Sequence, residues 1–184
     1  MTKKSRYGLL LLLCITFCLT AQAGSAFAKD QKAVAARIQA LNDQIVIANE
    51  ARDLPTALRA AEEAVKVAKE GYGKNSLQAA DTMNNLANLY LHIKRAPEAE
   101  QLYREAILIY LEKTDREGVE TASSFVNLGV AYAMQKKYTK AIDILNRALT
   151  IRLKKLGPEN EATQNTEQML ADLKKLAYPD EEKI

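Results

Sequence analysis

The chain has 184 residues with 26 basic and 23 acidic side chains, one histidine, two cysteines and no tryptophan. This near balance of charge argues against a nucleic-acid-binding domain, which needs a basic patch. A single histidine argues against a metal centre or an acid–base pair, because no second imidazole is present.

The first 28 residues are typical of a secretory leader. Three basic residues within the first six precede an apolar run over 9–19 that is too short to span a bilayer comfortably. A small-x-small pattern ends at Ala28, so we expect cleavage after Ala28, with a cut after Ala23 as the second choice. Retention of the segment as an uncleaved N-terminal anchor is the alternative.

Removal of this leader would change the net charge and the cysteine content of the chain. It contains three of the 26 basic residues and no acidic ones, so 23 basic residues would face 23 acidic ones. Both cysteines, Cys14 and Cys18, would leave with it. We therefore expect an exported protein, in the periplasm of a Gram-negative bacterium or secreted, without a disulfide or thiol chemistry.

The remaining sequence predicts seven helices joined by short turns. The first is expected over 32–51, where Val34, Ile38 and Leu41 recur at helical spacing, and the second over 55–70. The others are expected over 76–92, 96–113, 117–135, 138–156 and 160–177.

No stretch alternates β-branched with polar residues, so no sheet is expected. Short loops make successive helices antiparallel. The predicted fold is all-α, an α-solenoid of about three antiparallel helix hairpins over 29–178 with a C-terminal capping helix. Residues 179–184 are expected to form an acidic tail.

Several residue types recur at intervals of 42 residues along the predicted helices. Such a register indicates stacked units that reuse the same close contacts. The recurring residues are Ala57, Ala99 and Ala141; Ala64, Ala106 and Ala148; Asn85 and Asn127; Leu86 and Leu128; and Tyr90 and Tyr132.

Two central segments carry a family resemblance. Residues 84–90 read Asn-Asn-Leu-Ala-Asn-Leu-Tyr. The helix expected next has Ala99, Tyr103 and Ala106 in a small-x-x-x-Tyr-x-x-Ala pattern. This resembles a tetratricopeptide repeat of the longer kinesin-light-chain type, over most of residues 32–177. The resemblance implies a non-enzymatic scaffold or adaptor that binds a protein or peptide in its concave groove. No cofactor is expected, because the residues include no motif that would hold one. A self-associating assembly protein of the cell envelope is the alternative.

Within each hairpin we expect Ala87 and Gly129 to face Ala99 and Ala141, because small residues let helices approach closely. Ala106 and Ala148 are expected where the next unit docks. The larger residues expected to fill the space around them are Leu86, Tyr90, Tyr103, Leu128, Tyr132 and Leu145.

The candidate groove depends on amide side chains of the first helices of the hairpins. Asn84 and Asn88 lie four apart on one helix face, and an amide can both donate to and accept from a peptide backbone. An alternative role in bonding neighbouring helices is open at both positions, and it is favoured at Asn85 and Asn127. A clamp for a terminal carboxylate is not expected, because asparagine and valine stand where such family members carry Lys or Arg. The predicted groove residues are Asn42, Asn84, Asn88, His92, Val130 and Met134.

The sequence has no glycine-rich phosphate loop, activated nucleophile or zinc-protease motif. His92 is expected to end its helix, where its ring can interact with free carbonyls. We therefore predict no catalytic residues, no metal site and no nucleic-acid partner.

Overall fold

The computed structural model describes residues 30–114 and 116–179, and within them all regular structure is helical. The expected leader and its cleavage site lie outside the described residues, as does most of the expected tail. Among the described helices, none combines the length and the hydropathy of a transmembrane span. The helices are 30–50, α2 (Leu54–Gly71), α3 (Leu77–His92), α4 (Ala96–Lys113), α5 (Val119–Met134), α6 (Tyr138–Leu156) and α7 (Glu161–Ala177).

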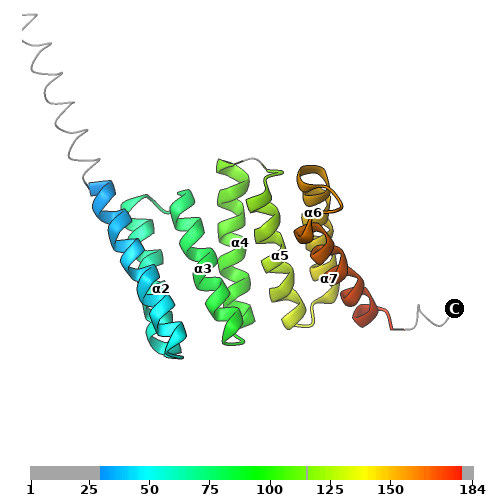
Figure 1. Ribbon diagram of the computed structural model, residues 1–184, viewed down its shortest axis with the longest axis horizontal. Coiled ribbons are helices and arrows are strands. Elements are labelled where there is room, and N and C mark those ends of the chain that lie inside the picture. Colours follow the sequence, from blue (N-terminus) through cyan, green and yellow to red (C-terminus); the bar gives the residue numbers. More distant parts are fainter. Residues whose placement is uncertain (1–29, 115, 180–184) are drawn as a thin grey trace, which may run out of the picture.

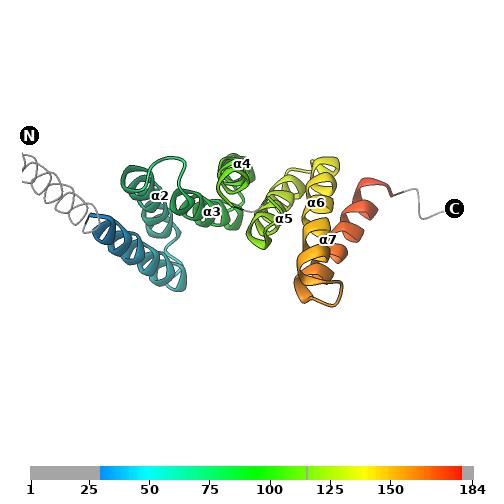
Figure 2. The ribbon, with the colours of Figure 1, turned by 90° about the horizontal axis from the view of Figure 1, so that it is seen from above.

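The helices stand side by side in one row along the long axis of the molecule, from the blue 30–50 helix to the red α7 (Figures 1 and 2). Helix α3 packs on α4 and α5 on α6, and the contacts α2–α3, α4–α5 and α6–α7 join successive units. The predicted all-α solenoid is confirmed. We call 30–50, α3, α5 and α7 the A helices, and α2, α4 and α6 the B helices.

Side-chain caps account for the small differences between predicted and observed helix starts. The side chains of Ser76 and Asn160, expected inside their helices, instead cap α3 and α7 by accepting from Ala79 N and Ala162 N at 3.1 and 2.9 Å. Helix α5 begins at Val119 rather than at Glu117, because Gly118 takes an extended conformation as its N-cap.

The 42-residue period also appears in the backbone of the turns between A and B helices. In each turn, one backbone N–H donates to the carbonyl of the residue five positions earlier, and this bond closes the end of the A helix. Each turn has one non-glycine residue with positive φ: Arg52 at 57°, Lys94 at 62° and Lys136 at 59°. The bonds are Asp53 N to Ala48 O, Arg95 N to Tyr90 O and Lys137 N to Tyr132 O, at 2.8, 2.7 and 2.9 Å.

One stripe of each inner A helix is buried and recurs in register. Ala80, Met83, Ala87 and Tyr90 of α3 correspond to Ala122, Phe125, Gly129 and Tyr132 of α5, and all are buried except the half-buried Tyr90. The same register on α7 gives Gln164, Glu167, Ala171 and Lys174, and all four are exposed. This stripe of α7 is therefore suited to water, as a capping helix requires.

The other end of the row also exposes positions that are buried in the inner repeats, but its residues are of mixed polarity. Ala79, Thr82, Leu86 and Leu89 are buried on α3, whereas their counterparts Arg37, Ala40, Gln44 and Ile47 on the 30–50 helix are exposed. Only Ile47 among these four is a large apolar residue.

The contact at Gly129 differs from the expected one. A Cβ added at Gly129 would lie 2.8 Å from Cγ and 2.9 Å from Cδ2 of Leu145. Gly129 therefore faces Leu145, one turn beyond the expected Ala141, although Ala141 is also fully buried. The shift follows from where the two helices cross, which the spacing of small residues does not specify.

Candidate partner-binding grooves

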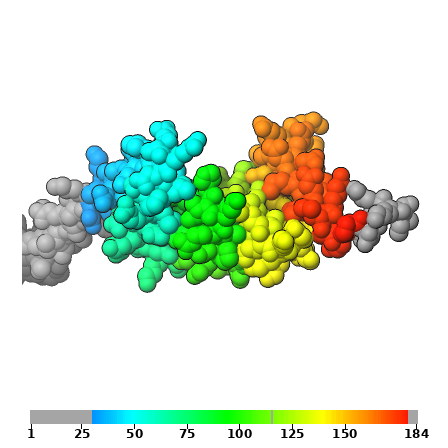
Figure 3. Space-filling view, turned by 90° about the horizontal axis from the view of Figure 1, so that it is seen from below, coloured from blue at the N-terminus to red at the C-terminus, as the bar shows by residue number. Residues whose placement is uncertain are grey.

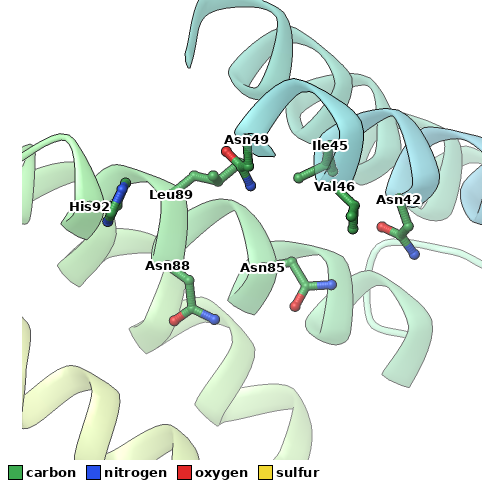
Figure 4. Close-up of a pocket in the computed structure, with 8 residues that line it drawn as sticks. All are labelled: Asn42, Ile45, Val46, Asn49, Asn85, Asn88, Leu89 and His92. Atoms are coloured by element: carbon green, nitrogen blue, oxygen red, sulfur yellow. The ribbon is translucent and has the colours of Figure 1, made fainter. Parts of the chain in front are cut away.

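An open groove of about 700 Å³ lies between the 30–50 helix and α3. Figure 4 shows the side chains that line it, which come from both helices. Its lining residues, which define the amide groove, are Asn42, Ile45, Val46, Asn49, Asn85, Asn88, Leu89 and His92.

The amide groove presents hydrogen-bonding groups that the protein itself does not use. Within the described residues, the side chains of Asn42, Asn49 and Asn85 bond to no other protein group. Val46, 56% exposed, adds apolar surface beside them, and none of the described residues that line the groove is charged. This combination suits the main chain and small apolar side chains of an uncharged segment.

A smaller recess of about 240 Å³ continues the amide groove towards the start of α3. It shares Asn42 and Asn85 with the larger groove and adds Gln39, Gln78 and Asp81. Asn85 therefore lies where the two recesses meet.

The next junction along the row, between α3 and α5, is bridged by side-chain contacts. Asn84 Nδ2 donates to Ser124 Oγ at 3.1 Å and to Tyr110 OH at 3.4 Å. Asn127 Nδ2 approaches Asn88 Oδ1 at 3.5 Å. Asn84 thus lies outside the amide groove and joins three helices, whereas Asn85, for which the sequence favoured a structural role, lines the groove.

Two buried tyrosines anchor this junction. The hydroxyl of Tyr110 donates to Asp81 Oδ1 at 2.6 Å, and that of Tyr103 donates to Asn88 Oδ1. Burial raises the pKa of both phenols above the ordinary value, and the bond to Asp81 raises the pKa of Tyr110 further. Both hydroxyls therefore remain protonated donors at neutral pH.

A second groove, of about 260 Å³, lies between α5 and α7. It contains the predicted residues Val130 and Met134, which are thereby separated from Asn42, Asn88 and His92. The residues that line it, and define the methionine groove, are Val130, Ala133, Met134, Met169, Asp172, Leu173 and Leu176.

The two grooves are equivalent places in the repeat, displaced by two units or 84 residues. Four positions differ in chemistry, and two keep the same residue. The corresponding pairs are Val46 and Val130, Asn49 and Ala133, Asn85 and Met169, Asn88 and Asp172, Leu89 and Leu173, and His92 and Leu176.

The space-filling view shows the surface hollowed between the cyan N-terminal part and the orange C-terminal part, over the green centre (Figure 3).

His92 is the last residue of α3 and lies at the rim of the amide groove. No group of three or more potential metal ligands occurs in the described part of the chain.

The sequence reasoning missed Asn49 and the groove role of Asn85. Asn49 lies seven residues after Asn42, on the same helix face, and this spacing was a usable signal. Nothing in the local sequence distinguishes Asn85 from Asn84, because they differ only in which neighbouring helix each one faces.

Paired helices stacked in a regular row, with grooves between the A helices, define a helical repeat protein of the kind that recognises other proteins. The family model for the tetratricopeptide repeat matches residues 36–112 and 120–177. The chain belongs to the tetratricopeptide repeat family, whose fold is a protein–protein interaction module and whose members are generally non-enzymatic.

Solved structures show the same fold. BtubC (BKLC) from P. vanneervenii is 26% identical, with a TM-score of 0.65 over 72% of this chain and 53% of that protein. A putative kinesin light chain from P. anserina with nearly identical TPR-like repeats is 17% identical, with a TM-score of 0.69 over 76% and 66%. The TPR2B domain in the complex of yeast Sti1 with pHsp70 is 17% identical, with a TM-score of 0.58 over 76% and 98%.

The chain thus spans about half the length of BtubC and about two-thirds of the P. anserina protein. No curated protein matches the sequence significantly.

Proposed function

We propose that this protein is an exported adaptor that holds an extended, uncharged segment of a protein partner in the amide groove. The observation that carries the proposal is the set of amides at Asn42, Asn49 and Asn85, which no group of the described residues satisfies, beside the apolar Val46 and Leu89. Each amide can bond a peptide N–H and a peptide C=O, while small side chains of the segment contact Val46 and Leu89.

In the yeast Sti1 structure, a TPR2B domain of similar fold is in complex with pHsp70. That similarity supports a peptide or protein as the occupant. The described residues that line the amide groove include no Lys or Arg, which favours an uncharged segment rather than an acidic one.

Self-association through the ends of the row is the alternative function. The polar stripe of α7 and the exposed Arg37 and Gln44 at the other end would be buried in such a contact, at a cost in desolvation. These residues therefore favour groove binding. Sedimentation over a range of concentrations separates the two, because end-to-end assembly would grow with concentration.

Site-specific photocrosslinking in cells tests the amide groove. A photoreactive residue placed at Val46 should crosslink to a partner, which mass spectrometry then identifies. Leu108 on α4 is the matched control, since it is an exposed aliphatic residue, 68% accessible, that lines neither groove.

The variant Asn85→Ala then checks the chemistry of the contact. It should reduce the Val46 crosslink without changing the helix content, because the side chain is exposed and makes no bond within the described residues. A crosslink of equal yield from Leu108, or one indifferent to Asn85→Ala, would show that the partner binds elsewhere.

The export proposal has its own measurement. Fractionation of cells that express the full chain, followed by N-terminal sequencing, should find the protein outside the cytoplasm and beginning at Lys29. A product that retains residues 1–28 in the membrane fraction would favour the anchor.

A further inference from the structure

The methionine groove offers a second surface whose chemistry differs from that of the amide groove. Met134 is 44% and Leu176 is 61% exposed, so both leave apolar surface in contact with water. The volume of about 260 Å³ is just below the range of about 300–1,000 Å³ that is usual for small-molecule sites. The volume and the two exposed side chains leave room for a few apolar side chains of a protein partner.

One carboxylate gives this groove a preference of charge. Asp172 occupies the place of Asn88 in the amide groove. Within residues 30–114 and 116–179, its polar partner is Gln168 of the same helix, whose Nε2 donates to Asp172 Oδ1 at 2.9 Å, and no cation pairs with it. A carboxylate beside apolar surface attracts a basic group and disfavours an acidic one.

The two thioethers make the groove adaptable. Met134 of α5 and Met169 of α7 face the same space from opposite sides. Methionine side chains are flexible and polarisable, so they fit apolar side chains of different shapes. The shape of the apolar residue is thus less restricted than the charge beside it.

We propose that the methionine groove is a second docking site, which takes a short partner segment with apolar side chains next to a lysine or arginine. The apolar side chains contact Met134 and Leu176, and the basic group pairs with Asp172. This site does not depend on the amide groove, so either one can fail without the other.

A random 12-residue peptide library displayed on phage, panned at low salt against the full chain, is the probe. We expect enrichment of peptides with Lys or Arg adjacent to Leu, Ile, Met or Phe. Fluorescence polarisation of a selected, labelled peptide should then show an affinity about two- to fivefold weaker for Asp172→Asn. Reversal of the charge in Asp172→Lys should weaken it more than about tenfold.

A charge exchange makes the assignment specific. Replacing the basic residue of the peptide by glutamate should restore binding to the Asp172→Lys protein. Met134→Gln should weaken binding of the same peptide. Helicity should be unchanged in the Met134 and Asp172 variants, because both side chains are exposed. Asn85→Ala is the matched control in the amide groove and should leave this peptide unaffected.

Selected peptides that bind wild type and Asp172→Lys equally, or a library that yields none dependent on Met134 or Asp172, would overturn the proposal. So would self-association of the protein that Met134→Gln abolishes, since the occupant would then be a second copy of the chain. Peptides that lose affinity only with Asn85→Ala would support the amide groove and overturn the second site.

Discussion

The amide groove and the methionine groove occupy the same places in the repeat, 84 residues apart, yet they differ in chemistry. Both keep a valine and a leucine, Val46 with Leu89 and Val130 with Leu173. Beside these shared residues, Asn85 of the amide groove corresponds to Met169 of the methionine groove, and Asn88 corresponds to Asp172. The repeated backbone positions a groove between A helices, and a few side-chain differences decide what each one can bind.

The junction between them, at α3 and α5, teaches the complementary lesson. Its equivalent positions carry Asn84 and Asn88, and their amides bond to Ser124 and Asn127 of the next A helix. Polar groups that could meet a partner are used there to join the two halves of the row.

The largest expected effect comes from breaking the C-terminal half alone. Phe125 is 1% exposed in the core of α5, and Phe125→Ala should lower the free energy of unfolding by about 3–5 kcal/mol. In a stack with nearest-neighbour contacts the loss should be greatest in α5, α6 and α7. Hydrogen exchange resolved by residue is the measurement.

Met83 is the equivalent residue one repeat earlier and gives the matched variant. Met83→Ala should instead increase exchange first in α2, α3 and α4. Uniform loss of protection in both variants would contradict nearest-neighbour behaviour and show that the row unfolds as one unit.

A smaller effect is expected at the close contact between Gly129 of α5 and Leu145 of α6. Gly129→Ala places a methyl group 2.8 Å from Cγ of the fully buried Leu145, and should cost about 1–3 kcal/mol in a thermal or denaturant melt. Leu145→Val should recover part of this loss by making room. A Gly129→Ala protein more stable than wild type would mean that helix propensity outweighs the contact.

The bridged junction should respond by about 1 kcal/mol. Asn84→Ala removes the donor to Ser124 and Tyr110. Asn84 Oδ1 is buried and accepts no bond from the described residues, so its removal leaves no donor without an acceptor. Denaturant unfolding should become less cooperative. The neighbour Asn85→Ala is the control and should leave stability unchanged; equal losses in both would contradict a joining role specific to Asn84.

The smallest effect should be a gain. Arg152 bonds to Ser123 Oγ, Thr166 Oγ1 and Ala162 O, at 3.3, 2.7 and 2.8 Å, without a carboxylate partner among the described residues. One repeat earlier, Tyr110 takes the place of Arg152 and Asp81 that of Ser123. Ser123→Asp would supply a partner and should raise stability by up to about 1 kcal/mol.

Differential scanning calorimetry at low and high salt measures this gain, which should shrink as salt screens the pair. Ser123→Asn is the uncharged control of matching size and should not show the salt dependence. A gain of the same size in both variants would assign it to hydrogen bonding rather than to charge.

Much of the fold could be predicted from the sequence because its determinants are local and periodic. The helical spacing of apolar residues and the 42-residue register predicted the helices to within about two residues. Ser76 and Asn160 were misassigned only as first helical residues rather than caps, a distinction that depends on one side-chain bond each.

The sequence by itself thus determined the class of fold, the repeat and the placement of amides on A helices, since helical periodicity assigns every residue to a face. Only the tertiary structure decided that Asn85 lines a groove while Asn84 closes a junction, and that Gly129 meets Leu145. These outcomes depend on how far apart neighbouring A helices lie and where they cross. Both are set by the sum of side-chain contacts between units, which the spacing along one helix does not contain.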